Sequence, residues 1–95
     1  PPAPVRPPRP RAVVWLRPDS PWVKLNTDGS FDHQTGVAGG GGFIRDHSGA
    51  LITAFHTSLQ ASSSYDAEIQ ALQIGLHLAA HLSSHIWIEL DAAAV

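Results

Sequence analysis

The polarity of the chain follows two different periods between Trp22 and its last residue. Apolar and polar residues alternate over 22–28 and again over 86–91, and a period of two is typical of a strand with one buried face. Over 65–82 the apolar residues recur instead at the spacing of one helix face. They are Ile69, Leu72, Leu76 and Ala79 or Ala80. These patterns predict two strands with a helix between them.

The residues between the first strand and the helix predict a β-hairpin. Five glycines within 36–42 lead into the candidate strand segment 43–46. The turn-forming residues 47–50 and a second candidate strand segment, 51–57, follow. We therefore expect a strand, a tight turn and a returning strand before the helix begins.

The expected helix has signals at both of its ends. Serines at 62–64 are N-cap candidates, and Asp66 and Glu68 are expected in the first turn, where the helix dipole favours acids. Ser83 and Ser84 are expected to end the helix. A helical connection returns the last strand parallel to an earlier one, so the element order predicts an α/β fold with three antiparallel strands and one parallel strand.

We assign residues 21–95 to one domain and residues 1–20 to a disordered, proline-rich linker. The prolines favour extended backbone and remove donors that a sheet would need. Prolines at Pro-x-x-Pro spacing would also suit a docking ligand, which is the alternative interpretation of this segment. A linker further implies an upstream domain in the intact protein.

Composition narrows the functional classes. The chain has 95 residues and a formal net charge of −2, and no apolar run reaches the roughly 18 residues of a membrane span. Most of the basic residues precede position 25, so the predicted domain should bind nucleic acid only weakly through charge alone. Cysteine is absent, which excludes thiolate metal sites and favours an intracellular location, nuclear or cytoplasmic.

Three acids lie where separate elements could bring them together. Asp28 is expected to end the first strand, Glu68 to begin the helix and Asp91 to end the last strand. Converging carboxylates suit hard divalent cations, which prefer oxygen ligands. On spacing alone the alternative stays open that Asp28 caps a turn, Glu68 balances the helix dipole and Asp91 caps a further helix.

Four segments of the chain resemble the ribonuclease H domain, and in detail the plant reverse-transcriptase-like subfamily derived from non-LTR retroelements. The segments are Trp22–Ser30, Ala38–Gly49, Ala67–Leu72 and Ile88–Ala92. They occur in the order of the family and at similar intervals. The resemblance implies a ribonuclease H-like mixed sheet.

The resemblance also implies an activity and a site. The family hydrolyses the RNA strand of RNA/DNA hybrids with two Mg²⁺ or Mn²⁺ ions, and Asp28, Glu68 and Asp91 match its first three metal-binding catalytic acids. Gly29 and Ser30 would lie beside the substrate. Recognition would depend on 2′-hydroxyl groups and duplex shape, with little dependence on base sequence.

The family has a fourth acid and usually a mobile histidine in a C-terminal part that would lie beyond Val95. We therefore expect a C-terminally truncated ribonuclease H-like domain. Two functions follow as hypotheses: a metal-dependent endonuclease, or a non-catalytic remnant that binds nucleic acid or a protein partner.

Three weaker patterns have competing interpretations. Glycines 39–42 lack the lysine and the helix start of a phosphate-binding loop. His77, His81 and His85 recur at intervals of four, a spacing found in zinc sites but also on solvated helix faces. Three tryptophans could stack on bases, although core packing is the expected role; they are Trp15, Trp22 and Trp87. The alternative for Trp87, which shares its strand face with Glu89 and Asp91, is a position at the rim of the metal site.

Overall fold

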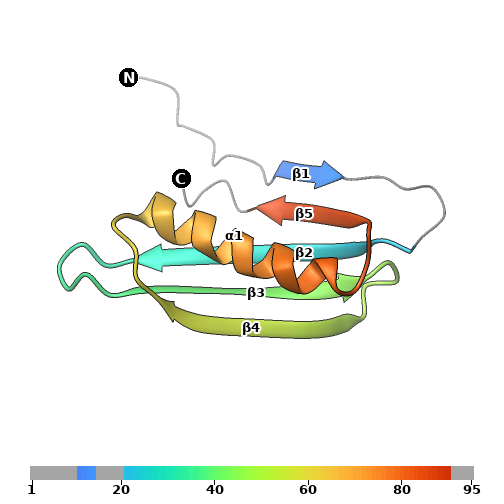
Figure 1. Ribbon diagram of the computed structural model, residues 1–95, viewed down its shortest axis with the longest axis horizontal. Coiled ribbons are helices and arrows are strands. Elements are labelled where there is room, and N and C mark those ends of the chain that lie inside the picture. Colours follow the sequence, from blue (N-terminus) through green and yellow to red (C-terminus); the bar gives the residue numbers. More distant parts are fainter. Residues whose placement is uncertain (1–10, 15–20, 91–95) are drawn as a thin grey trace, which may run out of the picture.

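The computed structural model describes residues 11–14 and 21–90, and the side chains of 21–90 (Figure 1). Within these residues the chain forms strands, one helix and short connections. In chain order the elements are β1 (Arg11–Val14), β2 (Val23–Phe31), β3 (Ala38–Asp46), β4 (Leu51–Leu59), α1 (Ser64–Ala80) and β5 (Ile86–Leu90). Among the described residues no helix is both long enough and apolar enough to cross a membrane.

The described strands form one mixed sheet in the order β1-β5-β2-β3-β4. Strand β2 pairs antiparallel with β3, which pairs antiparallel with β4. Strand β5 returns after the helix and pairs parallel with β2, with Val23 opposite Ile86 and Thr27 opposite Leu90. The predicted α/β fold, with three antiparallel strands and one parallel strand, is thereby confirmed.

Strand β1 was not expected. Arg11–Val14 pairs antiparallel with the outer edge of β5, and Arg11 lies opposite Leu90. The sequence Arg-Ala-Val-Val contains no proline, so its backbone donors are available to a neighbouring strand, unlike those of the prolines before it. The remaining residues of the expected linker lie outside the described residues, and the domain boundary at residue 21 stays a prediction.

Helix α1 packs on one face of the sheet through its smallest residues. Its buried positions are Ala67, Ala71, Gly75 and Ala79. A Cβ atom at Gly75 would lie 2.7 Å from Thr27 Cγ2 and 2.8 Å from Leu25 Cδ1, so the helix approaches β2 too closely for larger side chains. The leucines and the isoleucine that were expected to face the core lie beside this line of small residues and are only partly buried.

The core lies between the helix and the sheet. Leu25 and Ile44 are fully buried, together with residues from both parallel strands and the end of the helix. This cluster consists of Val23, Leu25, Ile44, Ala79, Ile86 and Ile88, with Leu72, Leu76, Leu78 and Leu90 packed against it. Ser83 Oγ, just past the helix, donates to Pro21 O at 2.6 Å and so ties the helix end to the start of β2.

The opposite face of the sheet is not covered by any other described element, and we call it the open face. Trp22 and Trp87 lie there with ring centroids 5.9 Å apart, and Trp22 is 39% exposed. The expectation of core packing is therefore wrong for Trp22, while Trp15 lies outside the described residues. The position of the two rings on the open face leaves them accessible to a partner.

Candidate functional site

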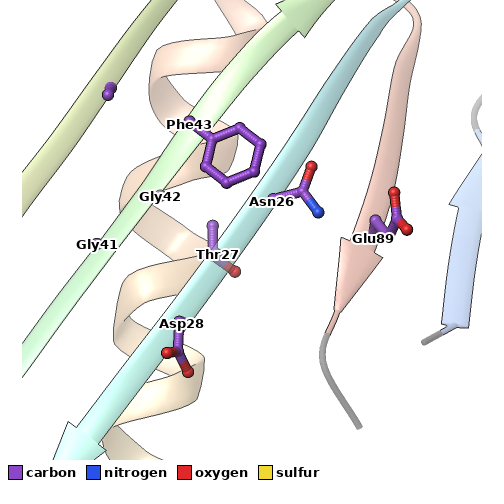
Figure 2. Close-up of a pocket in the computed structure, with 8 residues that line it drawn as sticks. Asn26, Thr27, Asp28, Gly41, Gly42, Phe43 and Glu89 are labelled. Atoms are coloured by element: carbon purple, nitrogen blue, oxygen red, sulfur yellow. The ribbon is translucent and has the colours of Figure 1, made fainter. Parts of the chain in front are cut away.

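Asp28 projects from the open face of β2. Leu25 and Thr27 are buried towards the helix, so the alternation along the strand turns Asp28 to the opposite side, where it is exposed (Figure 2). The strand continues to Phe31, so Asp28 lies within it and does not end it. Its carboxylate has no hydrogen-bond or ion-pair partner among the described residues. The interpretation of Asp28 as a turn cap is therefore wrong.

Three other aspartates have the structural roles that Asp28 lacks. Asp32 accepts hydrogen bonds from the backbone N–H groups of its own turn, and Asp46 accepts from Ser48 and Ala50 in the β3–β4 turn. Asp66, at the start of α1, accepts from Ser62 N at 2.9 Å. These donors favour the charged form and lower the pKa of all three carboxyl groups. Each is accounted for by local structure.

Glu68 reaches the residue next to Asp28. Its Oε1 accepts a hydrogen bond of 3.0 Å from Gly29 N, although the two residues are 39 positions apart. Only Asp66 lies in the first turn of the helix, after the N-cap Ser63, so the expectation that Glu68 also lies there is wrong. The Glu68 carboxylate is directed to the sheet and placed beside the strand that holds Asp28.

Gly29 makes this approach possible. A Cβ atom at this position would lie 2.5 Å from Ala67 O and 2.5 Å from Glu68 N, closer than real side chains come to backbone atoms. The absence of a side chain lets the start of α1 rest directly on β2. The Asp-Gly pair therefore combines an exposed acid with the backbone N–H that holds a second acid, Glu68, at the neighbouring residue.

Asp91, the third expected acid, lies outside the described residues. The last described residue of β5, Leu90, pairs with Thr27, which precedes Asp28. Among the described residues no group of three or more histidine, cysteine, aspartate or glutamate side chains is arranged to hold a metal ion. The site that can be described therefore consists of two of the three expected carboxylates, both with oxygen donors suited to hard cations.

Two shallow hollows on the open face meet at Asp28. One, of about 330 Å³, lies over β2, β3 and the end of β5, and Figure 2 labels Asn26, Phe43 and Glu89 around it. The other, of about 380 Å³, includes Gly29 and Ser30, the two residues expected beside the substrate. Ser30 is exposed on the same face as Asp28, whereas Gly29 faces the helix.

Glu89 and His56 were not singled out as site residues in the sequence. Glu89 Oε2 forms an ion pair of 2.8 Å with Lys24 Nζ across the parallel pairing of β2 and β5. His56 lies opposite Gly41, which in turn lies opposite Asp28. The alternation along each strand could indicate on which face of the sheet Glu89 and His56 lie. Only the register between the strands shows that both side chains lie on the same part of that face as Asp28.

The structure also places the weaker sequence patterns. Glycines 39–42 lie within β3, paired on both sides, and the strand continues through Phe43, so they form no phosphate-binding loop. The rings of His77 and His81 are in edge contact, with centroids 5.0 Å apart. His85 lies beyond the helix and is 2% exposed, which separates it from that pair.

Comparisons with known proteins agree with this fold. The family described as "Reverse transcriptase-like" matches residues 26–95. A protein of Arabidopsis thaliana named as a ribonuclease H protein is 36% identical over 69 residues, which are 73% of this chain and 11% of the relative. The chain thus spans about a tenth of that relative's length, and no solved structure matches it. The resemblance found in the sequence is confirmed, and the chain belongs to the reverse transcriptase-like family of ribonuclease H-like domains.

Proposed function

We propose that this domain hydrolyses the RNA strand of RNA/DNA hybrids at a divalent-metal site formed by Asp28 and Glu68, with Asp91 as a third ligand. The observation that supports this most is the Asp28 carboxylate, exposed and without a partner among the described residues, beside the amide that holds Glu68. An acid kept out of every local hydrogen bond suits ligand binding better than structure.

The oxygen donors of Asp28 and Glu68 fit Mg²⁺ or Mn²⁺. The resemblance to the ribonuclease H domain implies a pair of such ions. The ions would supply an activated water and stabilise the leaving oxygen at neutral pH. The two carboxylates would bind the ions and offset their positive charge. The hydrogen bond from Gly29 N–H fixes the position of Glu68. Ser30 on the same face offers a hydroxyl to the sugar of the bound strand.

Cleavage of a labelled RNA/DNA hybrid in Mg²⁺ or Mn²⁺ tests this proposal. We expect the wild-type chain to cut the RNA strand, and Asp28→Asn to lose at least about 100-fold because one ligand charge is removed. Asp46→Asn, which removes the same charge from a distant turn, should retain activity. Equal activity in all three proteins would point to a contaminating nuclease and contradict the proposal.

Glu68 allows its catalytic and structural roles to be separated. Glu68→Gln keeps an oxygen that can accept from Gly29 N, so its free energy of unfolding should stay near that of the wild type. Glu68→Ala leaves that N–H without its acceptor and should lose about 1 kcal/mol. Both should lose cleavage. An active Glu68→Gln variant would show that the carboxylate charge is not required.

Hybrid binding without cleavage is the second candidate function. It is favoured by the exposed Trp22 ring beside Trp87 on the open face, because aromatic side chains there can stack on bases. The same proteins distinguish the two functions, since a non-catalytic binder would bind the hybrid equally well with and without Asp28→Asn and cut it in neither case.

A further inference from the structure

The four glycines in β3 fall into two pairs with different surroundings. A Cβ atom at Gly40 would lie 3.0 Å from Ala71 Cβ, and one at Gly42 would lie 3.0 Å from Thr27 Cγ2, so both positions face the helix side and are filled by packing. Gly39 and Gly41 face the open side instead. At Gly39 an added Cβ would meet only ordinary contacts, 3.6 Å from Thr57 O and 3.7 Å from Ser30 Oγ. Packing therefore does not explain why Gly39 lacks a side chain.

These two glycines form the floor of the larger hollow beside Asp28. The strand register places Asp28 and His56 on either side of Gly41, and Ser30 lies beside Gly39. We call Asp28, Ser30, Gly39, Gly41 and His56 the glycine trough. Asp28 and Ser30 on β2 form one wall, and His56 on β4 forms the other. Because β3 lies between these strands, the two walls are about 10 Å apart at the usual strand spacing.

The chemistry of the trough selects one kind of occupant. Its three wall side chains are polar and exposed, and its floor is bare backbone, which offers little to an apolar ligand. A hydroxyl and an imidazole can both donate hydrogen bonds to phosphate oxygens or to a 2′-hydroxyl. A floor without Cβ atoms admits an extended polar backbone close to the sheet. A single nucleic-acid strand offers that backbone, with a phosphate or sugar hydroxyl at every step.

We propose that the glycine trough binds the sugar-phosphate backbone of the RNA strand, with His56 donating a hydrogen bond to it on the side opposite Asp28. This inference rests on the proposed function for the identity of the strand. His56 is then a positioning residue, and the strand passes over Gly39 and Gly41. Lys24 and Arg45 lie opposite each other on the same face, but four residues, or about 13 Å, along their strands from Asp28 and Gly41. His56 is therefore the described side chain at the trough with a nitrogen donor for the strand.

Binding of a labelled RNA/DNA hybrid, measured by fluorescence anisotropy separately from cleavage, tests this inference. Gly39→Val fills the floor with a side chain that strands accommodate well, and we expect hybrid binding to weaken roughly tenfold or more without loss of folding. His56→Ala should weaken binding by about three- to tenfold, the value of one hydrogen bond, and His56→Gln should restore part of it. His47→Ala, in the exposed β3–β4 turn, is the matched control and should bind as the wild type does.

The outcomes separate the trough from the cleavage activity. A wild-type chain that binds the hybrid without cutting it, and loses binding on His56→Ala, would support the trough while the proposed hydrolysis fails. Wild-type affinity in both Gly39→Val and His56→Ala would overturn the inference, as would absence of hybrid binding by the wild-type chain. Should Gly39→Val not fold, which its urea unfolding curve would show, the exposed His56 variants decide the question alone.

Discussion

Gly29 sets the distance between helix α1 and strand β2 at the candidate site. The helix backbone at Ala67 and Glu68 occupies the space that any side chain at position 29 would need, and the Gly29 amide donates to Glu68. The sequence indicated Asp28 and Glu68, and the resemblance placed Gly29 beside the substrate. The contact of Gly29 with the helix could not be predicted, because one strand pattern does not show which helix turn will lie over it.

Gly29→Ala should therefore destabilise the protein more than a glycine substitution normally does. The added methyl group forces α1 away from β2, and overpacking of this kind costs about 1–3 kcal/mol. Gly39→Ala is the matched control on the neighbouring strand, where contacts are ordinary, and should be neutral or stabilising by about 0.5 kcal/mol. Urea unfolding of both variants checks this. Equal stabilities would contradict the close approach of the helix.

At the scale of elements, strands β2 to β5 and the helix were predictable, whereas strand β1 and the packing of the helix were not. The predicted helix at 65–82 corresponds to Ser64–Ala80, because its cap and its apolar spacing are local signals. Its deepest contacts come from Ala67, Ala71 and Gly75, since the distance to the sheet is decided by both surfaces together. Strand β1 had no local signal beyond four residues without proline, and it depends on the free edge of β5.

The three acids that hold turns and the helix start should make stability depend on acid pH. Backbone and hydroxyl donors lower the folded-state pKa of Asp32, Asp46 and Asp66. Their contribution is therefore present above the unfolded value of about 4 and is lost as the pH falls through the lower folded values. The part of the free energy of unfolding that these three acids contribute should fall as the pH drops below about 4. Asp46→Asn should reduce that fall, and an unchanged pH profile in this variant would contradict the role given to its turn.

At the scale of the whole molecule, the sheet separates a packed face from a chemical face. The helix and the core cluster lie on one side, and Asp28, the glycine trough and the Trp22–Trp87 pair lie on the other. The sequence predicted the mixed sheet and two of the acids that the structure describes. It missed His56 and Glu89, because their nearness to Asp28 depends on the register of three strand pairs that no local pattern fixes.

The acids of the candidate site also explain how a chain with a net charge of −2 could bind a polyanion. Glu68 and Asp28 give the site local negative charge, so divalent cations must offset it before a phosphate can approach. We therefore expect binding of the nucleic acid to depend more on metal ions than on basic residues. The position of the metal ion is therefore the central claim.

Nuclear magnetic resonance with Mn²⁺ measures that position most directly, because the paramagnetic ion broadens the amide signals nearest to it. We predict that small additions of Mn²⁺ first broaden the amide signals of Asp28, Gly29 and Glu68. The signal of Asp46 should be spared, because Asp46 lies five residues, or about 16 Å, along β3 from Gly41, the residue that pairs with Asp28. Asp28→Asn should abolish the selective broadening. Uniform broadening, or broadening centred on Asp32, Asp46 or Asp66, would contradict a metal site at Asp28 and Glu68.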